Sequence, residues 1–421
     1  MGDTAAIGDV GPKKDDWKGT ILAGLANYID AGSIVSGAAA LALWQGIYGM
    51  SDNLLGLIAA FGPNAIGAGV GAMIGGWLCD KLGRKKIYQW DMLVYAFGMS
   101  ILVFAVAPWM IVLGFLIVGL AVGADIPASW SLIAEEAPDD RRGKHSGVAQ
   151  ILWNLGPVVV LLMSLALTGL GELGARIVFA HLVFIALGLT LLRRKMRESK
   201  RWEETQKVDA PRMPVSALFK GPYLMSILGL VGIYGFWNLW AGTNGLFFPF
   251  LMETLGVATR AESIALQCLN FGIGMVSNYF IFMAFVDKVN HRTMFLVSAA
   301  LQVIGMALLA ILPLSVPVVL LHVFLVGFAG GFGAQSFFQL WSAEMFPTAL
   351  RSTAQGVCFA IVRIGLGIFS FFVPLLAATD FTALAWILTG FLAISMFIGW
   401  LWAPSNAGKS LEEIEREQQA A

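Results

Sequence analysis

Twelve apolar segments, each long enough to cross a bilayer, follow one another along this chain with mostly short polar connections. A membrane-spanning helix needs about 20 mostly apolar residues. Soluble domains carry about 25% charged residues, whereas this chain has 13% charged and 58% hydrophobic residues. The bilayer must therefore be its solvent. We place the predicted spans at residues 19–44, 53–79, 87–107, 110–135, 146–170, 175–193, 222–252, 262–286, 293–312, 315–345, 352–376 and 381–403.

Positive charges are concentrated on one side of these spans. The first 17 residues are polar and contain no apolar signal core, so we expect the chain to start in the cytoplasm. With that start, 24 of the 27 lysines and arginines fall on the cytoplasmic side, Arg176 and Arg260 fall outside, and Arg363 lies within a span. This bias agrees with the positive-inside rule. It predicts a multi-pass protein of the cell (inner or plasma) membrane with both termini in the cytoplasm.

The longest polar gap lies near the middle of the chain and separates six spans from six. Two similar halves around a central site are the usual plan of a secondary transporter. Asp80 and Asp287 occupy corresponding positions, in "DKLGRKK" after the second span and "DKVNHR" after the eighth. We therefore predict a cytoplasmic tail (1–18), a six-helix bundle (19–193), a cytoplasmic central loop (194–221), a second six-helix bundle (222–403) and a cytoplasmic C-terminal tail (404–421).

The stretch "GWLCDKLGRKK", from Gly76 to Lys86, resembles the loop motif of the major facilitator superfamily, and the resemblance covers essentially the whole chain. It implies an all-α membrane protein with 12 transmembrane helices in two pseudo-symmetric six-helix bundles. It also implies that charged residues at cytoplasmic helix ends act as a gate. The expected gate residues are Asp80, Arg84, Glu135, Arg142, Glu344 and Arg351.

Narrower motifs resemble two branches of that superfamily. "YIDAGSIVSG" (28–37) and "EMFPTALRS" (344–352) are similar to signatures of the sugar-porter branch. "GADIPAS" (123–129) instead looks like the phosphate and organic-acid symporter relatives, and Phe115 stands where sugar porters carry an arginine. The resemblance therefore leaves both substrate classes open.

Three ionisable residues lie deep within predicted spans, where a charged group is costly and by default a functional candidate. Asp30 and Asp125 are the expected proton-coupling residues, and the alternative for each is a structural role, as a hydrogen-bonding group or as the partner of another buried charge. Arg363 has three interpretations, because a guanidinium stays protonated in a protein. It pairs with Asp30 or Asp125, it anchors an anionic substrate, or it snorkels toward the interface.

Neutral amides recur at helical spacing and predict a polar central cavity. Gln150 and Asn154, and likewise Gln335 and Gln339, are four residues apart and project from one helix face. Amides donate and accept hydrogen bonds together, which suits vicinal hydroxyl groups. We also expect the seventh span to break near Gly242 and expose backbone groups. The predicted substrate-binding residues are Gln150, Asn154, Asn238, Trp240, Asn244, Gln335, Gln339 and Arg363.

Other function classes are disfavoured. Three cysteines, far apart within apolar stretches, offer no metal spacing, and no phosphate-binding P-loop is present. We therefore expect no enzyme activity, cofactor, metal or nucleic-acid partner, and a monomer that interacts with a small substrate, protons and lipid. The predicted function is proton-coupled symport of a sugar or related hydroxylated molecule by alternating access. The alternative is transport of an organic anion or phosphate with Arg363 as anchor.

Overall fold

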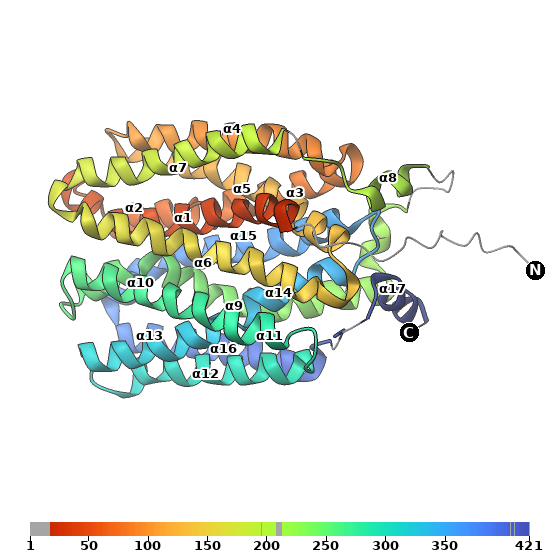
Figure 1. Cartoon of the computed structure of the whole chain (residues 1–421). Helices are drawn as coiled ribbons and strands as arrows, with labels where there is room; N and C mark the ends of the chain where they lie inside the picture. Colours follow the sequence, from red (N-terminus) through yellow and green to blue (C-terminus); the bar gives the residue numbers. More distant parts are fainter. Residues whose placement is uncertain (1–16, 195, 208–212, 405, 408, 421) are drawn as a thin grey trace, which may run out of the picture.

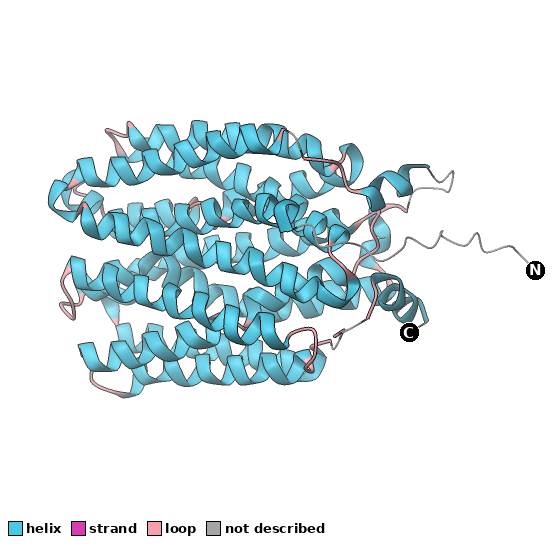
Figure 2. Cartoon of the chain, viewed as in Figure 1, coloured by secondary structure: helices cyan, strands magenta, loops and turns pink. Residues whose placement is uncertain are grey.

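The computed structural model describes residues 17–194, 196–207, 213–404, 406–407 and 409–420, so most of the predicted N-terminal tail and part of the central loop lie outside the described residues. The described chain is helical and contains no strand (Figure 2). The first half comprises α1 (Trp17–Tyr48), α2 (Asp52–Ala60), α3 (Ile66–Leu82), α4 (Arg84–Val103), α5 (Pro108–Glu136), α6 (Arg142–Ala166) and α7 (Glu172–Arg193). After α8 (Lys200–Lys207) follow α9 (Gly221–Thr254), α10 (Arg260–Ser277), α11 (Met283–Phe285), α12 (His291–Ile311), α13 (Val316–Gly330), α14 (Ala334–Glu344), α15 (Arg351–Thr379), α16 (Phe381–Trp402) and α17 (Leu411–Ala420).

The long helices run side by side along one common direction (Figure 1). Most helices of the second half, green to blue, lie below the red-to-yellow first half, and α15 packs closely against α3. By length and composition, nine helical stretches of the described residues can cross a membrane. α1, α4 and the α2–α3 pair run alongside them. The start of α1, α8 and α17 lie at one end of the bundle, which we call the α17 end.

Two predicted spans are interrupted in the structure. The span 53–79 divides into α2 and α3, because Gly62 and Pro63 end the first helix, and Asn64 lies in the gap. The span 315–345 divides into α13 and α14 around a glycine-rich turn at 331–333. Each of these spans therefore consists of two helices, and each break frees backbone groups near the centre of the bundle.

The opposite correction applies to the seventh span, where α9 continues without a break through Gly242. Pro249 lies inside this helix and has no N–H group, so the carbonyl of Gly245 loses its intrahelical donor. The side chain of Gln267 in α10 replaces that donor, with Nε2 lying 2.8 Å from the Gly245 oxygen. The predicted break at Gly242 is therefore wrong, and the one carbonyl group that Pro249 frees is satisfied by a neighbouring helix.

Glycine brings the two halves into backbone contact between α3 and α15. A Cβ atom on Gly76 would lie 2.2 Å from the carbonyl oxygen of Ser352, and one on Gly356 would lie 2.2 Å from that of Ala72. No side chain fits at either position. Small residues therefore let helices of opposite halves touch close to the α17 end.

The predicted C-terminal tail contains a helix that packs on the bundle. Leu411 and Ile414 of α17 are buried, whereas the neighbouring acidic residues face outward. Arg201 of α8 forms an ion pair of 2.7 Å with Glu412. The segments after the two bundles therefore meet each other and cover the α17 end.

Candidate functional site

A cavity lies between the two halves. Its wall comes from α1 and α6 of the first half and from α9, α10, α12, α13, α14 and α15 of the second, together with Asn64 in the α2–α3 gap. Small-molecule sites usually combine apolar walls with a few polar groups. This cavity has such a lining and lies at the interface of the two halves.

Most of the predicted binding residues line this cavity. The sequence placed eight residues at the substrate, and the structure puts seven of them at the cavity wall: Gln150, Asn154, Asn238, Trp240, Asn244, Gln335 and Arg363. Gln339 is the exception, since it is not among the described residues that line the cavity. Its Nε2 lies 3.4 Å from the carbonyl oxygen of Ser146, one helical turn closer to the α17 end than Gln335.

Three further amides at the cavity were missed by the sequence interpretation: Asn64, Asn270 and Gln302. Asn64 follows the Gly62–Pro63 pair, and that helix-breaking pair was the signal that could have revealed it. Gln302 is a lone polar residue in an apolar span, where an amide is more often interhelical glue. In the structure its Oε1 accepts a 2.9 Å hydrogen bond from Trp237 Nε1, which leaves its NH₂ group at the cavity.

Several polar atoms around the cavity are buried and have no hydrogen-bond partner among the described residues. They are the acceptors Asn64 Oδ1 and Gln150 Oε1 and the donors Gln302 Nε2 and Arg363 Nε. An unpaired buried polar atom costs about 1–3 kcal/mol. A ligand with hydroxyl groups would satisfy both kinds of atom, because each hydroxyl donates one hydrogen bond and accepts others.

Aromatic side chains form the apolar part of the wall. Trp153, Trp237, Trp240 and Phe271 all line the cavity. The indole N–H of Trp240 contacts the sulfur of Met306 at 3.3 Å. The indoles are thus held in place by neighbouring helices, and their faces can pack on the C–H surface of a ring-shaped ligand.

Arg363 lies at the cavity wall without an acidic partner. Its Nη1 is 3.3 Å from the carbonyl oxygen of Asn64 and 3.4 Å from Asn238 Oδ1, and its Nη2 is 3.3 Å from the Tyr234 hydroxyl. The guanidinium also lies over the ring of Phe359, 4.3 Å from its centroid. Within the described part of the chain it forms no ion pair, so the predicted pairing with Asp30 or Asp125 is not present in this structure. Its 2% exposure also rules out snorkelling here.

Asp30 lies behind the cavity wall. Trp153 Nε1 donates a 3.3 Å hydrogen bond to Asp30 Oδ2, and the same indole lines the cavity. The polar residues about one helical turn away bond elsewhere, since Asn27 donates to the Ala149 carbonyl and Ser33 to the backbone oxygen of Asp30. A protonatable carboxyl group thus sits one side chain away from the ligand space.

Asp125 lies away from the cavity and is paired. Arg193 Nη1 lies 2.9 Å from its Oδ1, and Ser129 donates to the same oxygen at 3.1 Å. Arg193 also lies 3.6 Å from Asp91 Oδ2. The sequence interpretation counted Arg193, at the end of the predicted span 175–193, among the cytoplasmic charges and did not consider Asp91, near the start of the span 87–107.

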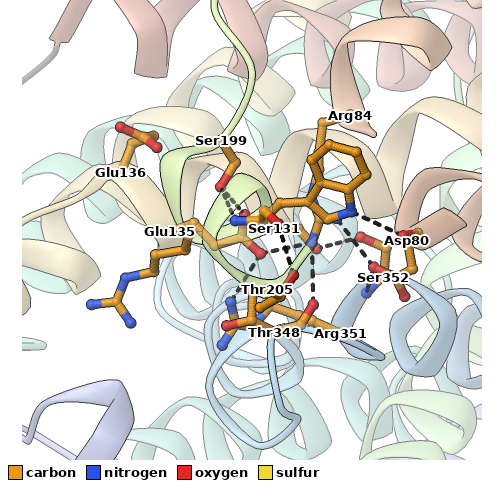
Figure 3. A network of polar contacts seen from close by, with 12 residues as sticks. Asp80, Arg84, Ser131, Glu135, Glu136, Ser199, Thr205, Thr348, Arg351 and Ser352 are labelled. Atoms are coloured by element: carbon orange, nitrogen blue, oxygen red, sulfur yellow. Dashed lines mark hydrogen bonds and ion pairs between the residues drawn. The ribbon is translucent and has the colours of Figure 1, made fainter. Parts of the chain in front are cut away.

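The predicted gate residues meet at the α17 end in two groups. In the first, Glu135 Oε1 accepts from Arg84 at 2.8 Å and from Arg351 at 3.0 Å, and Arg84 also lies 3.3 Å from Asp80 (Figure 3). Asp80 accepts from the backbone N–H of Thr353 at 2.6 Å, at the start of α15. This group joins α3, α4 and α5 of the first half to α15 of the second.

The second group occupies the position that corresponds to the first group under the pseudo-symmetry of the two halves. Arg142 lies 3.2 Å from Glu344 of the other half and 2.6 Å from Asp139. Asp287 accepts from the backbone N–H groups of Gly143 and Lys144, in the first turn of α6. Asp80 and Asp287 therefore each cap a helix of the opposite half. In this structure the α17 end is closed by contacts between the halves.

Comparison with known proteins gives a consistent picture. The family model described as Major Facilitator Superfamily matches residues 19–368. The minor myo-inositol transporter IolF of Bacillus subtilis (strain 168) is 45% identical over 414 residues, which cover 95% of this chain and 93% of that protein. The glucose transporter GlcP of Staphylococcus epidermidis (strain ATCC 12228 / FDA PCI 1200) is 26% identical over 399 residues, with coverage of 84% and 86%. The structure of the proton:xylose symporter XylE bound to 6-bromo-6-deoxy-D-glucose aligns with a TM-score of 0.81 at 19% identity, covering 96% of this chain and 98% of that one.

Proposed function

Because this chain belongs to the major facilitator superfamily, we propose that it is a proton-coupled symporter of a neutral polyhydroxylated ring, either a sugar or a cyclitol. The membership confirms the predicted fold of 12 transmembrane helices in two six-helix bundles and the resemblance to the sugar-porter branch. Two relatives, named as a myo-inositol transporter and a glucose transporter, support the substrate class. The proposed mechanism is alternating access between the two halves.

The observation that carries this proposal is the set of unpaired donors and acceptors at the cavity. Two oxygens and two nitrogens without partners among the described residues match a molecule whose hydroxyl groups both donate and accept. The tryptophan wall adds a surface for the ring's C–H face. In the proposed complex Gln150, Gln302 and Arg363 contact ligand hydroxyl groups.

The anionic alternative is not favoured. Arg363 is already coordinated by a carbonyl, an amide oxygen and a hydroxyl group, so its charge is partly compensated by neutral groups. Asp30, behind the indole of Trp153, adds a negative charge next to the cavity when ionised. We therefore assign Arg363 to hydroxyl recognition, with Nε as its free donor.

In the proposed cycle Asp30 carries a proton next to the substrate, and Asp125 serves as a second proton-coupling residue. Protonation removes charge from the region around the cavity, which lets the halves rearrange around a neutral interior. The charged groups at the α17 end act as the cytoplasmic gate, which opens when the halves separate there. We further propose that this end faces the cytoplasm and that one chain suffices for transport.

The experiment is uptake into proteoliposomes that contain the purified protein. Labelled neutral sugars, cyclitols, sugar acids and phosphate are supplied with and without an inward proton gradient. We expect gradient-driven accumulation of a neutral sugar or cyclitol. Asp30→Asn should abolish accumulation and retain substrate exchange, because exchange needs no net proton movement. Uptake of anions alone would contradict the substrate class, and full accumulation by the variant would contradict the role of Asp30.

A further inference from the structure

Two carboxyl groups and one guanidinium meet inside the first half, apart from the cavity. Asp91 comes from α4, Asp125 from α5, and Arg193 is the last residue of α7. Their exposed fractions are 5%, 1% and 1%. The gate and the substrate cavity use none of the three, and the proposed cycle uses only Asp125, so the roles of Asp91 and Arg193 remain to be explained.

Arg193 is fixed in place by the start of α1. Its Nε donates to the carbonyl of Leu22 at 3.1 Å, and its Nη2 donates to that of Ala23 at 3.0 Å. Only Nη1 points to the acids, 2.9 Å from Asp125 Oδ1 and 3.6 Å from Asp91 Oδ2. One guanidinium edge therefore serves two carboxyl groups.

The first oxygen of each acid is satisfied, and the second is not. Asp125 Oδ1 also accepts from Ser129, and Asp91 Oδ1 accepts from the backbone N–H of Met92 at 2.6 Å. Neither Asp91 Oδ2 nor Asp125 Oδ2 has a hydrogen-bond donor among the described residues. Both carboxyl groups nevertheless lie within ion-pair distance of the same guanidinium nitrogen, Arg193 Nη1. Two ionised carboxylates only accept hydrogen bonds, so neither can satisfy the free oxygen of the other unless one of them is protonated.

The charge balance leads to the same result. Arg193 is the only cation within ion-pair distance of either acid in the described part of the chain. The other titratable groups that face the cluster are acidic: Tyr88 of α4, whose ring centroid lies 4.5 Å from the guanidinium carbon, Cys79 of α3 and, farther away, Asp30 of α1. With both acids ionised, the cluster carries a buried net negative charge. One added proton makes it neutral, as in other closely spaced carboxyl pairs.

We propose that Asp91 and Asp125 hold one proton between them, that Arg193 positions the pair, and that this pair is a second proton-binding site of the transporter. Proton binding itself needs only the observed geometry, whereas a part in transport rests on the proposed proton coupling. α1 connects the two sites, since it carries both the carbonyl groups that hold Arg193 and the carboxyl group of Asp30. A rearrangement of α1 during the cycle would move Arg193 relative to the pair and change its hold on the proton.

The test is infrared spectroscopy of the purified full-length protein in lipid nanodiscs near neutral pH. The wild type should show a carboxylic-acid C=O band that shifts in D₂O. Asp91→Asn should lose this band, because the remaining Asp125 carboxylate and Arg193 form a neutral pair that needs no added proton. Asp125→Asn should lose the same band for the same reason. Asp52→Asn, at an exposed outer position, is the matched control and should keep it.

The outcomes separate the site from the function. If the band persists in both variants, the shared proton is refuted, and the second variant covers a failure of the first to fold. Asp91→Asn should also lower gradient-driven accumulation by about tenfold and leave counterflow within about twofold. Wild-type accumulation by this variant would overturn the role of the pair in coupling. A wild type that ignores the proton gradient but shows the band would refute the proposed symport and leave the proton site standing.

Discussion

Arg351, at the start of α15, donates a 3.0 Å hydrogen bond to Glu135, near the end of α5 in the other half. Both side chains are nearly inaccessible to solvent. Removal of one partner of a buried ion pair costs about 3–5 kcal/mol, because the remaining charge loses its compensation. Without Arg351, Glu135 still forms its ion pair with Arg84 of the same half. The stabilisation that is lost is therefore mainly that of the contact between the halves.

We therefore predict that Arg351→Gln opens the α17 end. The equilibrium should shift on the order of a hundredfold toward the state open at this end. The measurement is thiol labelling of Ser131→Cys, which lies between the halves 2.9 Å from Ser352 Oγ, in a background without the native cysteines. Arg176→Gln is the control, because Arg176 pairs with Glu172 within one helix at the opposite end. Equal labelling rates with and without the Arg351→Gln substitution would show that the ion pair does not hold the gate closed.

The second prediction concerns the glycine contact beside that gate. Gly356→Ala should destabilise the protein by about 1–3 kcal/mol, because the new methyl group would overlap the backbone oxygen of Ala72. Gly365→Ala on the same helix meets no atom within 4 Å and should gain up to about 1 kcal/mol of helix propensity. Thermal unfolding in detergent compares the two. Equal midpoints for both variants would mean that α3 and α15 are not in contact in the protein as purified.

The course of the helices was largely predictable from the sequence, because bilayer thickness sets the length of an apolar segment. The predicted spans 110–135 and 352–376 differ from α5 and α15 by only one to three residues at each end. The errors lie where a residue of another helix determines the backbone conformation. In α9, Gln267 of α10 replaces the donor that the Gly245 carbonyl loses to Pro249, and no local pattern reveals such a donor.

The candidate site was predictable in part. Amides at helical spacing, such as Gln335, could be assigned to the cavity because a polar residue in an apolar span must face a polar space. Asn64, which lines the cavity from a helix gap, was missed. Which charges pair was not predictable either, since the contact of Arg193 with Asp125 joins residues 68 positions apart and depends on how α5 and α7 pack.

A third prediction uses two glutamines of α14 that differ by one helical turn. Gln335 lines the cavity and accepts a 2.7 Å hydrogen bond from Tyr234, whereas Gln339 lies outside the cavity lining of the described chain. Gln335→Ala should raise the KM for the transported ring about tenfold, the value of one hydrogen bond of roughly 1.4 kcal/mol. Gln339→Ala removes the same amide and should leave KM within about twofold. A larger increase in KM for Gln339→Ala than for Gln335→Ala, measured by proteoliposome uptake, would show that the substrate binds closer to the α17 end.

The last prediction concerns pH and Asp287, which lies between α11 and α12 outside the spans. Burial raises the pKa of the Asp287 carboxyl above its usual value, and the backbone N–H groups of Gly143 and Lys144 lower it by less. Between the unfolded and the folded pKa, the folded protein therefore binds more protons than the unfolded chain. Stability falls as the pH rises through this window and then stays constant above it. Once ionised, Asp287 thus carries a desolvation cost that its two backbone hydrogen bonds offset only in part.

Asp287→Asn should remove this cost and keep an oxygen that accepts from Gly143, so the variant should be at least as stable as the wild type at neutral pH. Its advantage should shrink as the pH falls through the folded pKa, because the wild-type carboxyl then becomes neutral as well. Asp287→Ala is the control for the helix cap, since it leaves two amide groups without an acceptor and should lose about 1–3 kcal/mol over the whole pH range. The test is the unfolding midpoint of each protein measured as a function of pH. If the stability of the wild type relative to Asp287→Asn increases as the pH rises, the capping hydrogen bonds outweigh the cost of burial.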